Sequence, residues 1–172
     1  MLKENKIISV LTIENSSLAV DLAKCLFDSG IRNLEITLRT KEAKKATELI
    51  INTNLDFNIG IGTVLTKGDL SFAKNIGADF ALSPSTDIKL IKESFKIDFK
   101  FIPGVSSSTD INTSTILGCK ILKLFPTIQL GGLSYFKSIY SPFKSFDVKF
   151  IALGGINDKN AEDFIKNELF IG

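Results

Sequence analysis

The sequence contains no histidine among its 172 residues. This absence excludes a histidine general base, a Ser-His or Cys-His dyad, and any metal site that uses imidazole ligands. If the protein is an enzyme, its proton transfers must come from carboxylates, lysine, tyrosine or water.

Cysteine and long apolar runs are also scarce. The two cysteines, Cys25 and Cys119, lie far apart in apolar segments, which provides neither a disulfide framework nor a thiolate metal site. The first residues, MLKENKIISVL, lack the apolar region of a signal peptide, and no apolar run approaches the ~20 residues of a membrane span. We expect a cytoplasmic protein that does not enter a membrane.

Charge is nearly balanced, with a formal net charge of +2, and the lysines are spread along the chain. A nucleic-acid footprint would need basic residues gathered on one face, so we expect no nucleic-acid partner. An apolar content of 44% with 23% charged residues is ordinary for a globular protein. No linker or low-complexity tract is present, so residues 1–172 are predicted to form a single domain.

Short apolar runs alternate with longer amphipathic ones throughout the chain. Strands are predicted at 6–11, 33–38, 57–61, 79–82, 100–102, 119–125, 148–153 and 169–171. Helices are predicted from Asn15 or Ser16 to Asp28, over about a dozen residues capped by Thr40, at 68–76, at 87–94, after the serines at 106–108, at 132–140 and at 159–166.

Eight strands, seven of them followed by helices, imply a parallel sheet. Eight is the number that closes a (β/α)8 TIM barrel, whose active site lies at the carboxyl ends of the strands. A doubly wound open sheet is the structural alternative. The typical barrel has about 250 residues. We therefore expect an α/β barrel that lacks the last helix and leaves apolar surface uncovered near its final strand.

The segment ILKLFP at 121–126 places a lysine in a short apolar strand. Alternation puts Ile121, Lys123 and Phe125 on one face. Desolvation lowers the pKa of an ammonium group, and a neutral lysine is a nucleophile that can form a Schiff base. The alternative is a lysine at the strand end that extends its charge into solvent.

The second strand carries a similar signal in NLEITLRT, where Glu35, Thr37 and Arg39 share one face. A barrel strand has no solvated face, so these side chains are expected to point into the barrel. A buried glutamate and arginine are costly unless they are paired or functional. The alternative is an ordinary structural Glu–Arg pair.

Three glycine- or proline-containing turns provide weaker signals. Gly60 and Gly62 would let backbone approach a ligand closely, and Thr63 offers a hydroxyl to an anion. Ser83-Pro84 follows the fourth strand. Gly154 and Gly155 follow the seventh strand, where barrels commonly bind phosphate. Plain strand-to-helix turns would use the same residues.

Together these segments resemble a known family. LEITLRT, GIGTVL, ALSP, FIPGV, ILKLFP, the stretch from Gly131 to Phe143 and LGGIN match the KDPG/KHG aldolases in order and spacing, from about residue 6 to the end. The resemblance implies a class I aldolase, a homotrimeric barrel that acts on pyruvate-derived 2-oxo acids without metal or other cofactor.

The resemblance also implies roles for individual residues. Lys123 resembles the Schiff-base lysine and Glu35 the general acid/base. Arg39 and Thr63 resemble the clamp on the pyruvate carboxylate. The same pocket would be lined by Pro84 and Phe125, and Gly154 and Gly155 resemble part of the phosphate cup.

The sequence also departs from the family pattern. Leu153 stands where the family usually has threonine, and Thr127 and Ile128 replace alanine and glutamate. The family continues beyond the position of Gly172 with a Gly-Ser-rich loop and a final helix, so we expect a C-terminally shortened member with weakened phosphate binding. Two alternatives remain at this point: a catalytically impaired scaffold or remnant, and a different phosphate-binding barrel enzyme.

Overall fold

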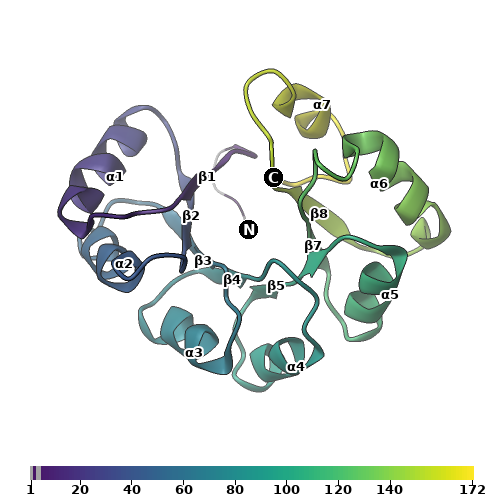
Figure 1. Ribbon diagram of the computed structural model, residues 1–172, viewed down its shortest axis with the longest axis horizontal. Helices are drawn as coiled ribbons and strands as arrows, with labels where there is room; N and C mark the ends of the chain where they lie inside the picture. Colours follow the sequence, from purple (N-terminus) through teal and green to yellow (C-terminus); the bar gives the residue numbers. More distant parts are fainter. Residues whose placement is uncertain (1, 3–4) are drawn as a thin grey trace. The chain divides into compact units, whose positions relative to one another are not determined.

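The computed structural model describes residues 2 and 5–172. The chain folds into two compact units, one that ends at Leu82 and one that runs from Ser83 to Gly172. Parallel strands alternate with helices in both units (Figure 1). The prediction of one domain over 1–172 stays a prediction.

The N-terminal unit is a four-stranded parallel arrangement in sequence order, β1-β2-β3-β4. Helices α1, α2 and α3 lie along one side of these strands (Figure 1). The elements are β1 Ile8–Leu11, η1 Ser16–Leu18, α1 Ala19–Asp28, β2 Asn33–Thr37, α2 Ala43–Ile51, β3 Asn58–Gly62, α3 Lys67–Asn75 and β4 Phe80–Leu82.

Strands β2 and β3 are buried along their whole length, on both faces. Leu34 and Ile36 of β2 are fully buried, as is Ile61 of β3. Strands buried on two faces are typical of parallel sheets that are covered by helices. The polar residues of β2 are therefore buried because of the fold and not because of local sequence.

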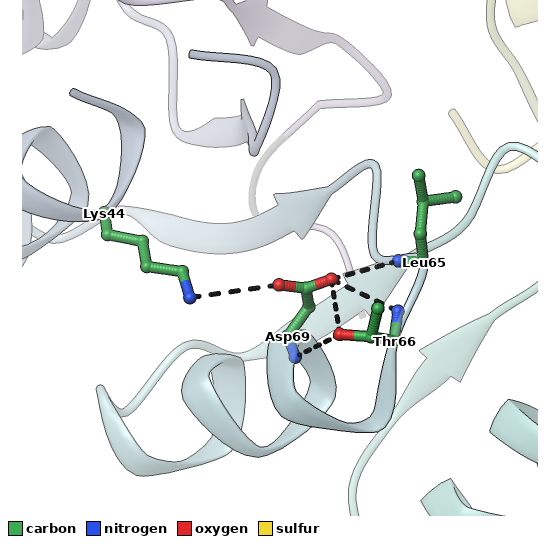
Figure 2. A network of polar contacts seen from close by, with 4 residues as sticks. All are labelled: Lys44, Leu65, Thr66 and Asp69. Carbon is green, nitrogen blue, oxygen red and sulfur yellow. Dashed lines mark hydrogen bonds and ion pairs between the residues drawn. The ribbon is translucent and has the colours of Figure 1, made fainter. Parts of the chain in front are cut away.

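Helix α3 begins with a capping box (Figure 2). The Thr66 hydroxyl accepts the Asp69 backbone N–H at 3.1 Å, and the Asp69 carboxylate accepts the Thr66 N–H at 3.1 Å. Lys44 of α2 lies 3.9 Å from the other carboxylate oxygen of Asp69. The box satisfies amide groups that the first turn of a helix leaves without partners.

The C-terminal unit contains the parallel strands β6-β7-β8 in that order. Its elements are α4 Ile88–Lys96, β5 Phe101–Ile102, β6 Gly104–Val105, α5 Ser108–Ile116, β7 Ile121–Leu124, α6 Gly132–Tyr140, η2 Ser141–Phe143, β8 Lys149–Ala152 and α7 Ala161–Ile165. After α7, Phe170 forms a parallel bridge with Phe150 of β8.

Aromatic side chains fill the core of the C-terminal unit. The Phe136 ring of α6 lies 4.8 Å from the Phe150 ring and 4.7 Å from the Phe170 ring, measured between centroids. Both contacts have the edge-to-face geometry that aromatic pairs favour. The segment that follows α7 is thus packed against β8 and α6.

All eight predicted strand positions have β structure, within a few residues of the expected bounds. The fifth is divided into β5 and β6 at Pro103, which has no backbone N–H to donate. The eighth is a single bridge at Phe170. Helix α7 is shorter than the predicted 159–166.

The predicted cap at Thr40 is wrong. Helix α2 begins at Ala43, and the Thr40 hydroxyl donates instead to the carbonyl of Ile13 at 2.6 Å. A contact with a distant loop has replaced the local cap. Among the residues that the structure describes, no helix is long and apolar enough to cross a membrane.

We predict that Thr66→Ala lowers the free energy of unfolding by about 1 kcal/mol, because it removes the hydroxyl that caps α3. Chemical denaturation measures the change. Ser71→Ala is the matched control, since Ser71 is an exposed residue of the same helix. Equal stability of Thr66→Ala and the wild type would contradict the role of the cap.

We also predict that the two thiols differ in reactivity. Cys25 is exposed, whereas Cys119 is 6% exposed and burial raises the pKa of its thiol to about 11. At about pH 8 roughly one Cys119 thiol in a thousand is then the reactive thiolate. Iodoacetamide should therefore label Cys25 in the folded protein and both thiols after denaturation, as read by peptide mass spectrometry. Equal labelling in the folded protein would contradict this burial.

Candidate active site

The side chain of Glu35 lies inside the N-terminal unit. Glu35 is in the middle of β2, is 1% exposed, and is paired in register with Val10 of β1 and Gly60 of β3. Strand alternation places Leu34 and Ile36 on the opposite face. The predicted burial of this carboxylate is confirmed.

Gly62 provides the space that the Glu35 side chain occupies. A Cβ atom built on Gly62 would overlap Glu35 Oε1 and would lie 2.6 Å from Cγ and 2.7 Å from Cδ. A Cβ atom on Gly60 would overlap the ring of Phe80. The sequence suggested that these glycines make room for a ligand, but side chains of the protein itself fill the space beside both.

Arg39 and Thr63, which the family resemblance implies act together, lie in contact. The Arg39 Nε donates to Thr63 Oγ1 at 3.2 Å, and the Arg39 side chain is otherwise exposed. Thr63 has a φ of 59°, in the left-handed region that few residues with a Cβ adopt. The pair lies just beyond the carboxyl ends of β2 and β3. An exposed guanidinium in this position can bind a carboxylate through two hydrogen bonds.

Three side-chain hydrogen bonds join the loop after β1 to the chain around Arg39. The Thr12 and Thr37 hydroxyls lie 3.0 Å apart, Thr40 bonds the Ile13 carbonyl, and the Ser16 hydroxyl donates to Glu42. The Ser16 bond lowers the pKa of the Glu42 carboxyl below its usual value. Sequence reasoning missed the contact between Ser16 and Glu42 because no local pattern pairs residues 26 positions apart.

Lys123 is buried in the C-terminal unit. It is 2% exposed on β7, and its backbone N–H donates to the Pro103 carbonyl at 2.9 Å. Leu122 and Leu124 point to the opposite face, into the apolar core. The Lys123 Nζ lies 5.1 Å from the centroid of the Phe125 ring. The lysine is therefore buried and is not a solvated residue at the strand end.

Pro84 packs close to the strand next to Lys123. Gly104 is paired in register with Lys123, and a Cβ on Gly104 would overlap the backbone of Pro84. The Gly104 N–H donates to the Ser85 carbonyl at 3.2 Å. The loop that carries Pro84 is thus held against β6 within the C-terminal unit.

Gly154 and Gly155 connect the loop after β8 to the loop after β7. The Thr127 N–H donates to the Leu153 carbonyl at 2.7 Å, and the Ile128 N–H donates to the Gly154 carbonyl at 3.0 Å. The φ values of Gly154 and Gly155 are +96° and +76°. A Cβ on Gly154 would lie 2.9 Å from Pro126 Cα. Both glycines are needed for this close packing, whether or not a ligand binds there.

Each unit thus brings together part of the predicted site. In the N-terminal unit the Glu35 side chain packs against Gly62, and Arg39 donates a hydrogen bond to Thr63. In the C-terminal unit the Lys123 amine lies near the Phe125 ring, and Pro84 packs against Gly104. Over residues 2 and 5–172, no three His, Cys, Asp or Glu side chains are grouped as metal ligands. A buried amine, a buried carboxylate and an exposed guanidinium can provide a nucleophile, a proton acceptor and an anion clamp.

Comparisons with known proteins agree on one family. The family model described as KDPG and KHG aldolase matches residues 1–171. The 2-dehydro-3-deoxy-phosphogluconate aldolase of Treponema pallidum (strain Nichols) is 32% identical over 164 residues, which cover 95% of this chain and 77% of that protein. The KHG/KDPG aldolase of Escherichia coli (strain K12) is 33% identical over 174 residues, 100% of this chain and 81% of that protein.

Solved structures agree with these relatives. The KDPG aldolase of Legionella pneumophila, with pyruvate captured at low pH as a covalent carbinolamine intermediate, is 38% identical with a TM-score of 0.90, covering 97% of this chain and 80% of that one. The 2-keto-3-deoxy-6-phosphogluconate aldolase of Zymomonas mobilis ZM4 with 3-phosphoglycerate is 31% identical with a TM-score of 0.90, covering 97% and 78%. These matches confirm the predicted fold class, the TIM-like α/β fold, and the chain belongs to the KDPG and KHG aldolase family.

Proposed function

We propose that the protein cleaves 2-keto-3-deoxy-6-phosphogluconate to pyruvate and glyceraldehyde 3-phosphate, or 4-hydroxy-2-oxoglutarate to pyruvate and glyoxylate, by class I Schiff-base chemistry. The observation that carries this proposal is the burial of Lys123 in the middle of β7. A lysine amine can act as a nucleophile and form a Schiff base with a carbonyl substrate.

In the proposed mechanism Lys123 attacks the C2 ketone of the substrate. Loss of water from the carbinolamine leaves an iminium ion. Glu35 accepts the proton of the C4 hydroxyl, the C3–C4 bond breaks, and its electron pair moves into the iminium to form an enamine. The aldehyde leaves. A proton then returns to C3, and water hydrolyses the iminium to release pyruvate and the free Lys123 amine.

The other residues bind substrate in this proposal. Arg39 and Thr63 hold the carboxylate next to the reacting C2, so that the iminium carbon is kept in place. Pro84 and Phe125 line the pocket around the pyruvate part of the substrate. Their packing in the C-terminal unit supports this role, because Phe125 lies beside the Lys123 amine and the Pro84 loop contacts the neighbouring β6.

We propose that Gly154 and Gly155 contribute to binding of the substrate phosphate. The support is their place after β8, where barrel enzymes commonly bind phosphate. The carbonyl of Gly154 and that of Gly155 are engaged with the Ile128 N–H and the Asn160 amide, so any contact with phosphate would use N–H groups. A homotrimeric assembly and a cytoplasmic location complete the proposal. The assembly rests on the family resemblance, and the location rests on the scarcity of cysteine in the sequence.

The Legionella pneumophila relative supports the covalent step, since pyruvate was captured on that protein as a carbinolamine. A scaffold or remnant without activity is the competing hypothesis. It is not favoured, because Lys123, Glu35, Arg39 and Thr63 are all present in a chain of the family fold. Trapping of the covalent intermediate separates the two hypotheses.

We predict that borohydride reduction in the presence of pyruvate gives a stable pyruvyl adduct on Lys123. Reduction of the iminium converts a reversible bond into a secondary amine, which intact-mass and peptide mass spectrometry detect. Lys123→Ala should give no adduct. Lys149→Ala is the matched control, because Lys149 begins the adjacent strand but its side chain is exposed. Absence of an adduct on the folded wild type would rule out the Schiff-base mechanism.

We predict that Arg39→Lys raises KM for the 2-oxo acid substrate by about 10- to 100-fold, because an ammonium cannot bind a carboxylate in the bidentate way of a guanidinium. Steady-state kinetics measures this. Arg32→Lys is the control, since Arg32 is the other arginine of the sequence and its guanidinium bonds the carbonyls of Phe27 and Ile31. An unchanged KM in Arg39→Lys would show that Arg39 does not bind the substrate carboxylate.

A further inference from the structure

The Glu35 side chain extends along the sheet toward the carboxyl ends of the strands. Glu35 is paired in register with Gly60, yet its Cγ, Cδ and Oε1 atoms lie where a Cβ on Gly62 would be. Gly62 is two residues further along β3, about 6.6 Å at the usual rise of a strand. The carboxylate is therefore displaced from the level of its own backbone toward the strand ends.

This displacement brings the carboxylate to the level of Thr37, the register partner of Gly62. Gly62 is directly followed by Thr63, whose hydroxyl accepts the Arg39 Nε at 3.2 Å. The Leu38 N–H donates to the Gly62 carbonyl at 2.9 Å and fixes the strand end beside Arg39. Gly62 thus sets how far Glu35 reaches toward the Arg39–Thr63 pair.

Space, and not backbone conformation, is what position 62 requires. Gly62 is not among the glycines with a positive φ, so its backbone is open to alanine. An alanine Cβ, however, would overlap Oε1 and lie 2.6 Å from Cγ and 2.7 Å from Cδ. A Cβ atom cannot make contacts this short, so the Glu35 side chain would have to move from its position.

We infer that Gly62 is a positioning residue for the reaction: its missing side chain lets Glu35 place its carboxylate at the strand ends. This inference rests on the proposed role of Glu35 as the general acid/base. Gly62 touches neither substrate nor reacting atoms in this scheme and acts through Glu35. The space beside Gly60 is instead filled by Phe80, which is fully buried, so Gly60 serves packing alone.

The test compares Gly62→Ala with Gly60→Ala, two equivalent substitutions in one strand that meet different neighbours. Gly62→Ala should lower kcat for cleavage of 2-keto-3-deoxy-6-phosphogluconate by about 100-fold, because a displacement of about 1 Å costs this much in catalysis. Its KM should stay within a few-fold, and borohydride with pyruvate should still label Lys123. Gly60→Ala should lower the melting temperature but keep kcat per folded molecule within about 3-fold.

Glu35→Asp adds a measurement of coupling that a purely structural defect at position 62 would not change. Asp is one methylene shorter, so its carboxylate cannot reach the strand ends in either background. Glu35→Asp should lower kcat in the wild type but cause no further loss in Gly62→Ala, and this non-additivity would report coupling between the two positions. In the Gly60→Ala background the loss should be fully additive.

Several outcomes would overturn the inference. These are wild-type kcat in Gly62→Ala, equal losses of kcat in both glycine variants, and additive losses in the Gly62→Ala/Glu35→Asp double variant. If Gly62→Ala alone does not fold, Gly62→Ala/Glu35→Ala has room to fold, because alanine at position 35 has no Cγ, Cδ or Oε1, and a kcat below that of Glu35→Ala would contradict the inference. A wild type that forms no pyruvyl adduct and cleaves no substrate would instead refute the proposed function itself.

Discussion

Strands that are buried on both faces are the constraint on which the candidate site depends. Every residue of β2 and β3 is buried. Contact with solvent therefore cannot explain why any side chain of these strands is polar. A charged group in such a strand costs free energy that its interactions must offset. Glu35 in β2 and Lys123 in β7 both occupy positions of this kind. The fold therefore distinguishes them from the many lysines and carboxylates on the surface.

Glycines provide the space that buried groups in this protein occupy. The same lack of a Cβ has different consequences along the chain: Gly62 admits the Glu35 side chain, Gly60 admits the Phe80 ring, and Gly104 admits the backbone at Pro84. At Gly154 the glycine also needs its left-handed backbone, with a φ of +96°. Loops and strands thus approach each other closely at positions where the residue is glycine and has no side chain.

Much of this arrangement could be predicted from the sequence, because alternation and glycine spacing are local properties. The period of two in ILKL placed Leu122 and Leu124 in the core and Lys123 on the other face, as observed. The glycines at 60 and 62 were recognised as sites of close approach, but not which atoms approach them. The sequence pattern marks a missing Cβ, whereas the neighbour that fills the space comes from another strand.

The contacts that were missed share one physical cause, since each joins residues that are distant in sequence. Thr40 has the side chain of a helix cap, yet its hydroxyl bonds the Ile13 carbonyl, because the parallel strands bring the loops after β1 and β2 together. Ser16 and Glu42 meet for the same reason. The Ser16 bond lowers the pKa of Glu42, so the carboxylate form that accepts this bond persists to lower pH than in a free side chain. The loop that carries Arg39 is therefore held by groups that no local motif contains, and Arg39 is positioned by the sheet as much as by its own sequence.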